Sequence, residues 1–147
     1  MYKKIFVPID GSRASQNALG EALAFAKSQK AAVCLFHAYE GFKHTGPDGK
    51  VDLTKALKDE GQLLLDEAAA RAKGAGVKTE ARLVDVKGHR TSRVLTKEAE
   101  RWGADLIVMG THGRHGFERL MLGSVAEGVV RRSRLPVMLL PAGDESD

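Results

Sequence analysis

The sequence predicts an α/β protein with an open, doubly wound, five-stranded parallel sheet that is covered by helices on both faces. Two observations lead to this prediction. Five short and almost continuous apolar runs recur along the 147 residues, and segments with helical periodicity separate most of them. Strands that alternate with helices favour right-handed βαβ crossovers, and ligands of such sheets bind beyond the carboxyl ends of the strands.

The first predicted strand is the apolar run of residues 5–9, which ends in a turn at Asp10. Pro8 cannot donate a ladder hydrogen bond, so we expect it at the end of this strand. A helix is predicted over residues 13–27, because small apolar residues recur there at helical spacing. Ser12 is placed to cap the first turn of that helix.

The second predicted strand, residues 31–39, contains the single cysteine of the chain, Cys34. One cysteine cannot form an intrachain disulfide, and its apolar neighbours predict a small buried side chain in a reducing compartment. The next stretch, residues 40–50, is polar, contains glycine and lacks periodicity. We therefore expect it to be a loop.

The longest helix is predicted over residues 52–73. Asp52 is expected to cap its beginning, and Gly74 and Gly76 are expected to end it. The third strand follows over residues 77–86, where apolar and polar residues alternate before the pattern becomes more apolar.

The last part of the chain contains two more helix and strand pairs. A helix over residues 92–102 is expected to stop at Gly103, and the fourth strand follows at residues 106–109. A short helix is predicted over residues 124–132, and the fifth strand over residues 136–141 has a proline at each end.

The charged residues argue against a nucleic-acid partner. The chain has 23 basic and 19 acidic residues and a net charge of +4, but both signs are interspersed, and aromatic residues make up only 5%. A nucleic-acid binder normally shows a basic stripe with aromatic stacking groups, whereas the densest basic run here is Arg131, Arg132 and Arg134. We expect no nucleic-acid partner.

Length and apolar pattern predict a single cytoplasmic domain over residues 1–147. The chain is long enough to bury one substantial core and short for two ordinary domains. No apolar run reaches the length of a membrane span, and the first apolar run is too short for a signal peptide. We therefore expect no membrane partner.

The most informative segment follows the fourth strand, where Gly110 and Gly113 are followed, after nine further residues, by Gly123. Gly110 is expected to turn the chain off the strand, and Gly113 to allow positive φ or close backbone approach. Gly123 is expected to expose amide N–H groups at a helix N-terminus, where they favour an anion. Ser124 adds a hydroxyl, although with Glu127 it would also form a capping box. At this spacing, the combination predicts phosphate binding.

These residues resemble a known family. Residues 108–113, VMGTHG, together with Gly123, Ser124 and Val125, resemble the G-x2-G-x9-G-[S/T] signature of ATP-binding universal stress proteins. Residues 5–12, IFVPIDGS, resemble the first strand of that family. The resemblance implies the strand order 3-2-1-4-5, a role in stress adaptation, and homodimers that pair their fifth strands, here Val137 to Leu140.

The resemblance also implies the residues of an ATP site. Pro8 and Asp10 lie at its first-strand side, with Asp10 near the ribose. Ala38 occupies the position whose backbone recognises adenine, and Met109 borders the base. The residues expected to cradle the ribose and phosphates are Gly110, Gly113, Gly123, Ser124 and Val125.

Asp10 has two further interpretations. Its carboxylate could coordinate magnesium that bridges phosphates, because hard cations prefer oxygen ligands. It could also be a turn residue that accepts backbone N–H groups. The five histidines show no zinc-binding spacing, so no protein-held metal is expected.

Three functions remain open at this point. The first is an ATP-binding stress-response regulator, in which residues 111–122 change order with the bound phosphate. The second is a slow ATPase or autophosphorylating enzyme that uses Ser124. The chain has no P-loop, so fast hydrolysis is not expected, and no catalytic residue can be nominated. The third is a nucleotide-free interaction module.

Overall fold

A computed structural model describes residues 1–41, 43–46, 49–111 and 122–142 of the chain. It confirms the five-stranded parallel sheet, in the spatial order β5-β2-β1-β6-β7. This is the expected order 3-2-1-4-5 of the predicted strands. The strands are β1 (Lys4–Pro8), β2 (Ala32–Tyr39), β5 (Thr79–Asp85), β6 (Leu106–Gly110) and β7 (Val137–Leu140).

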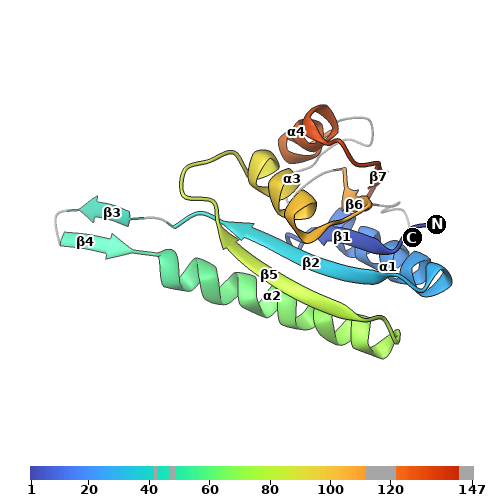
Figure 1. Ribbon diagram of the computed structural model, residues 1–147. Coiled ribbons are helices and arrows are strands. Elements are labelled where there is room, and N and C mark those ends of the chain that lie inside the picture. The colour runs from blue at the N-terminus through green and yellow to red at the C-terminus, as the bar shows by residue number, and fades with distance from the viewer. Residues whose placement is uncertain (42, 47–48, 112–121, 143–147) are drawn as a thin grey trace.

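Helices cover both faces of this sheet (Figure 1). One face packs against α1 (Arg13–Gln29) and α2 (Thr54–Gly74), and the other packs against α3 (Thr91–Trp102) and α4 (Ser124–Arg132). Successive residues of a strand point to opposite faces, so an apolar run supplies both cores. In β1, Val7 belongs to the core under α1 and α2, whereas Phe6 belongs to the core under α3 and α4.

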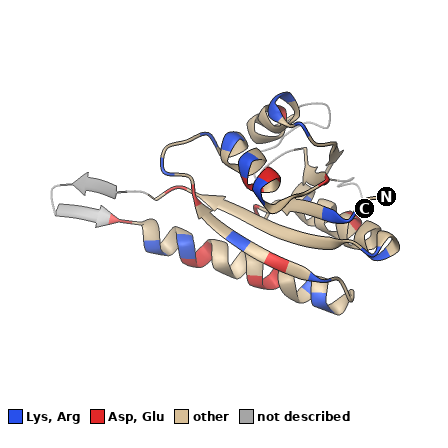
Figure 2. Ribbon diagram, viewed as in Figure 1, with Lys and Arg blue, Asp and Glu red and all other residues tan. Residues whose placement is uncertain are grey.

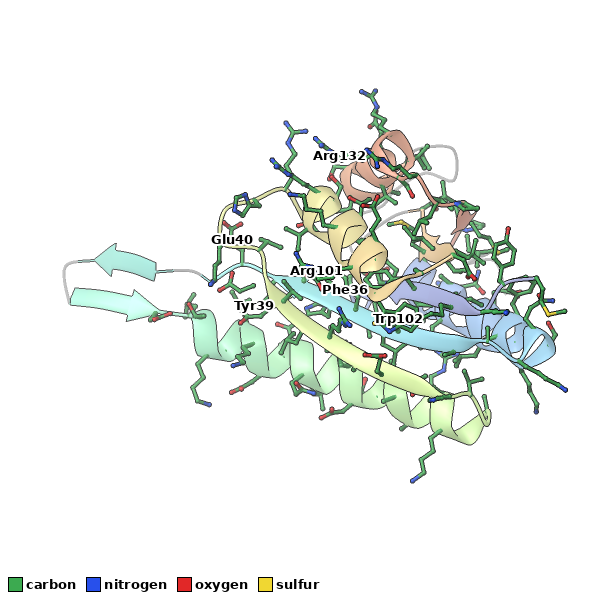
Figure 3. All side chains as sticks on the ribbon, in the orientation of Figure 1. Phe36, Tyr39, Glu40, Arg101, Trp102 and Arg132 are labelled. Atoms are coloured by element: carbon green, nitrogen blue, oxygen red, sulfur yellow. The ribbon has the colours of Figure 1, made fainter. Side chains whose placement is uncertain are left out.

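The core under α3 is built around aromatic residues. Phe6 and Phe36 have ring centroids 5.2 Å apart, and the Trp102 ring lies 6.5 Å from Phe6. Figure 3 shows Trp102 and Phe36 where α3 covers the sheet. The Trp102 indole N–H donates to Glu80 Oε1 at 2.6 Å, so its polar atom is satisfied at the edge of the core.

The structure confirms two of the predicted helix ends and modifies a third. The Ser12 side chain caps α1 by accepting from the Ser15 amide at 3.1 Å, and Gly103 ends α3 in the left-handed conformation with φ of 85°. The N-cap of α2 is Leu53, one residue after the predicted Asp52. Asp52 Oδ1 still accepts from the first-turn amide of Thr54 at 2.9 Å.

The prediction that residues 40–50 form a loop is wrong. The antiparallel strands β3 (Lys43–Gly46) and β4 (Gly49–Asp52) form a hairpin there, which extends away from the main sheet (Figure 1). A hairpin held by backbone hydrogen bonds does not need alternating apolar residues. Periodicity therefore could not reveal it.

Charged residues of both signs are interspersed along α2 and α3, as the ribbon colours of Figure 2 show. This distribution agrees with the mixed charge pattern of the sequence. Among the helices that the structure describes, none combines the length and the apolar character that a membrane span requires.

Cys34 provides a testable property of the core. It is fully buried, and burial raises the pKa of its thiol from 9.0 to about 12. We expect a thiol reagent at about pH 8 to leave the folded protein unmodified and to react once urea unfolds it. Fast modification of the folded protein, with the kinetics of a free thiol, would show that Cys34 is accessible.

The same shift predicts a dependence of stability on pH. Above pH 9 the unfolded chain loses the thiol proton while the folded chain keeps it, so the free energy of unfolding falls between pH 9 and 12. The stabilising contribution is fully present below pH 9. Urea unfolding of the wild type and of Cys34→Ala at increasing pH should show a steeper fall for the wild type.

Candidate functional site

The carboxyl edge of the sheet has a step between β1 and β2. The register pairs Pro8, the last residue of β1, with Phe36, whereas β2 continues to Tyr39. Pro8 therefore lies at the strand end, as predicted. Beyond it, the side of β2 that faced β1 has no strand neighbour within the described sheet.

The backbone of Ala38 faces this step. Phe36 points its carbonyl toward β1, where it accepts from Ile9 N at 2.7 Å, and Tyr39 points its carbonyl toward β5, where it accepts from Val86 N at 2.8 Å. Backbone groups of successive strand residues alternate between the two neighbouring strands. Ala38 therefore directs its N–H and C=O toward the β1 side, past the end of β1.

The turn after β1 holds Asp10 in place. Asp10 N donates to Ser15 Oγ at 3.1 Å, and Asp10 Oδ1 accepts from Ser12 N at 2.9 Å. Gly11 has φ of 81°, a conformation that favours glycine. Asp10 thus has the turn role that the sequence left as one of its interpretations, and the turn fixes it at the end of β1.

Gly110 is close to the first turn of α1. A Cβ at this position would lie 2.7 Å from the carbonyl carbon and the Cβ of Ala14, and 2.9 Å from Ser15 N. The chain does not turn at Gly110, because Thr111 N still donates to Leu140 O of β7 at 2.9 Å. The expectation that Gly110 turns the chain off the strand is wrong. Its lack of a side chain lets α1 approach β6.

Thr111 connects the end of β6 to the start of α4. Its carbonyl accepts from Gly123 N at 2.7 Å, which places the first turn of α4 at the carboxyl edge of the sheet. Met109 belongs to the core beneath α4, and Gly110 faces α1. By strand alternation, the Thr111 side chain lies on the α4 side.

The Thr111 hydroxyl oxygen is buried and has no hydrogen-bond partner among the residues that the structure describes. A buried hydroxyl without a partner loses its hydration without compensation. We therefore expect Thr111→Val to leave the free energy of unfolding unchanged or to raise it by up to about 1 kcal/mol. The matched control is Thr96→Val, which removes a hydroxyl that donates to Arg93 O at 3.1 Å and should lower stability. Urea unfolding would contradict the assignment if both variants lost stability equally.

The first turn of α4 has the geometry of an anion site. Its N-cap is Gly123, with φ of −64° and ψ of 159°, and no side chain in the described part of the chain caps the helix. The predicted capping box of Ser124 with Glu127 is wrong, since the N-cap is Gly123 and not Ser124, and the Glu127 carboxylate accepts from Arg131 at 2.8 Å instead. None of the described residues accepts a hydrogen bond from the amides of Ser124, Val125 or Ala126.

The amide of Gly123, at the N-cap of α4, already has a hydrogen-bond partner. The expectation that Gly123 itself exposes a free N–H is wrong, because that N–H donates to the Thr111 carbonyl. The amides from which no described residue accepts belong to the next three residues along the chain. The Ser124 side chain is exposed, and Val125 is half-buried against the core beneath α4.

The structure brings most of the predicted site residues to one edge of the sheet. Pro8 ends β1 and Asp10 lies in the turn after it, Ala38 is near the end of β2, and Met109 and Gly110 end β6. Gly123 caps α4, and Ser124 and Val125 are its first two residues. Gly113, the remaining predicted site residue, lies outside the described residues. The described part of the chain contains no group of three or more acidic, histidine or cysteine side chains that could hold a metal ion.

Two residues that shape this edge were not nominated from the sequence. One is Thr111, which joins β6 to α4, and the other is His37, whose Nδ1 lies 2.7 Å from Ile9 O. Both are polar residues near the carboxyl end of a buried strand. That combination was the signal that could have identified them.

Comparison with known proteins identifies the family. Residues 1–141 match the model of the universal stress protein family. Universal stress protein MJ0531 of Methanocaldococcus jannaschii is 36% identical over 95% of this chain and 82% of its own length. A universal stress protein structure from Burkholderia pseudomallei is 35% identical, with a TM-score of 0.79, and covers 95% of this chain and 96% of its own.

A third similar protein was solved with a ligand. It is a universal stress protein in complex with cAMP, which is 29% identical, has a TM-score of 0.72 and covers 97% of this chain and 98% of its own. The sheet order, the helices on both faces and the family match agree with one another. This chain belongs to the universal stress protein family.

Proposed function

We propose that this protein is an ATP-binding regulator of the stress response that acts as a nucleotide-dependent switch in a homodimer. The observation that carries the proposal is the first turn of α4 at the carboxyl edge of the sheet, which no described side chain caps. Amides without a partner at a helix N-terminus attract anions, because the helix dipole adds to their partial positive charge.

The phosphates would bind at this turn. The amides of Ser124, Val125 and Ala126 offer donors with no acceptor among the described residues, and the Ser124 hydroxyl is exposed beside them. Backbone N–H groups can bind phosphate oxygens where no P-loop lysine is present. This arrangement favours binding of the polyphosphate over its rapid hydrolysis.

The base would bind at the step beside β2. Ala38 directs one donor and one acceptor to the same place, and the edge of adenine offers an acceptor and a donor in return. Met109, which is 5% exposed, is the last residue of β6 in the apolar core and lies next to this edge. The relative solved with cAMP supports an adenine nucleotide as the ligand.

Asp10 would lie at the ribose side, where the β1 turn holds it. Magnesium would be bound chiefly through the phosphates, because Mg²⁺ in nucleotide sites is usually coordinated by phosphate oxygens and by only one or two protein carboxylates. Asp10 can supply one such carboxylate. Its Oδ1 already accepts a hydrogen bond from Ser12 N.

The homodimer would form through β7, an edge strand of the five-stranded sheet. Its residue Met138 is 36% exposed. An edge strand presents unpaired backbone groups that a second copy can extend. The switch would be the segment between Thr111 and Gly123, whose two ends are joined by their backbone hydrogen bond.

The test is calorimetry of purified, nucleotide-stripped protein with ATP, ADP and GTP, combined with light scattering to count subunits. We expect one ATP per chain, weaker binding of GTP, and a dimer. Absence of heat and of any shift in melting temperature with either adenine nucleotide would overturn nucleotide binding. A monomer at all concentrations would overturn the dimer alone.

A further inference from the structure

We infer that His37 is a positioning residue of the nucleotide site. Its imidazole holds the carbonyl of Ile9, and this bond both directs Asp10 away from the sheet and keeps the backbone of Ala38 available to the base. The inference rests on the nucleotide binding proposed above, and it adds a residue to that site.

Consecutive residues of β2 hold both backbone groups of Ile9. Ile9 N donates to Phe36 O at 2.7 Å, and Ile9 O lies 2.7 Å from His37 Nδ1. A carbonyl oxygen can only accept, so Nδ1 must carry the proton of this bond. Ile9 is the residue that links β1 to Asp10, so these two bonds set the direction in which the chain leaves the sheet.

The imidazole replaces a bond of the strand ladder. If the parallel ladder of β1 and β2 continued by one step, the Ala38 N–H would donate to Ile9 O. The structure contains no such bond. His37 takes the Ile9 carbonyl instead, so the carbonyl is satisfied while the Ala38 N–H keeps no partner from β1.

The position of the ring is fixed by α2. A Cβ at Gly61 would lie 2.5 Å from His37 Cδ2 and 3.1 Å from Nε2, and 2.8 Å from a methyl group of Leu83. Glycine within a helix costs stability, and here its missing side chain is the space that the imidazole occupies. The ring is therefore held between β2 and α2 with Nδ1 toward Ile9.

The bond between His37 and Ile9 and the turn after β1 together fix the position of Asp10. Asp10 is anchored on its C-terminal side by Ser15 Oγ and Ser12 N. His37 provides the anchor on the N-terminal side. With both anchors present, the carboxylate at the end of β1 and the backbone of Ala38 keep a fixed spacing along the site.

The experiment compares His37→Asn, His37→Gln and His37→Leu. All three variants lose the ring beside Gly61, but only asparagine places an amide nitrogen the same number of bonds from Cα as Nδ1. We expect ATP affinity to fall by about tenfold in the Leu and Gln variants, the effect of one lost hydrogen bond, and to stay within about threefold of wild type in Asn. Melting temperature should fall similarly in all three.

The readouts separate the possible results. Equal affinities in the three variants, or affinities that follow melting temperature alone, would overturn the positioning role. Long-range ¹H–¹⁵N correlation of the imidazole should show the proton on Nδ1 of the wild type, and a proton on Nε2 alone would also overturn it. If the wild type binds no nucleotide, the proposed function fails, whereas the tautomer still tests the Ile9 bond independently.

Discussion

Gly123→Val is expected to weaken ATP binding by about 100-fold or more, equivalent to about 2.7 kcal/mol. The valine side chain would stand at the N-cap of α4, where phosphate oxygens must approach the amides of Ser124 and Val125 to about 3 Å. The backbone of Gly123, with φ of −64° and ψ of 159°, suits any residue. The ligand-free protein should therefore lose no more than about 1 kcal/mol of stability, the usual cost of a poor N-cap. Calorimetry and urea unfolding measure the two quantities.

Gly123→Ser provides the matched variant. Serine is a preferred N-cap residue, because its oxygen accepts from the second or third amide of the helix. The same oxygen would compete with a phosphate for those amides. We expect Gly123→Ser to raise the stability of the ligand-free protein and to lower its ATP affinity. An increase in both would mean that the phosphates do not use this turn.

Gly110→Val is expected to lower the free energy of unfolding by about 3 kcal/mol, at the upper end of the cost of overpacking a core. Its side chain would meet the backbone of Ala14 and Ser15 at 2.7 to 2.9 Å, and backbone cannot move aside as a flexible side chain can. The displaced turn also holds Asp10 through Ser15. ATP affinity should therefore fall together with stability.

The control for this prediction is Gly74→Ala at the end of α2. A Cβ there would meet nothing within 4 Å, and its backbone is not left-handed. We expect this variant to be as stable as the wild type or more stable by up to about 1 kcal/mol. If Gly110→Val unfolded at the same urea concentration as Gly74→Ala, the packing of β6 on α1 described above would be wrong.

The fold was predictable because its main pattern is local. Each strand of the central sheet is a short apolar run, since both of its faces are buried, and each helix carries its apolar residues at helical spacing. Ser12, Gly103 and Pro8 took the predicted positions because caps and strand ends depend on neighbouring residues. The hairpin of β3 and β4 was missed because its ladder has no apolar signature.

The arrangement of the candidate site could be predicted to the level of the elements that meet there. The sequence indicated the ends of three strands and the start of α4, and the structure places these together. It did not indicate which partners the backbone N–H and C=O groups of these residues bind. Gly123 uses its own N–H on Thr111, and Ile9 O binds the imidazole of His37, because each bond joins segments far apart in the chain.

The role of Gly110 also depends on a contact between segments that are far apart in the chain. A glycine at a strand end suggests a turn, and the sequence contains no sign that α1 crosses there. Residue 110 must lack a side chain because of Ala14, which is 96 positions away along the chain. A Cβ at residue 110 would lie only 2.7 Å from Ala14. Only the tertiary packing could distinguish a turn glycine from a contact glycine.

An ATP titration followed by ¹H–¹⁵N correlation spectra tests whether the nucleotide binds between Ala38 and the first turn of α4. We expect the largest shifts of amide signals on Ser124, Val125 and Ala126 at one end of the site and on Ala38 at the other. AMP should reproduce the shift of Ala38 and reduce those of α4. Saturable binding that leaves these four amides unshifted, with the largest changes elsewhere on the protein, would show that ATP does not bind at this edge of the sheet.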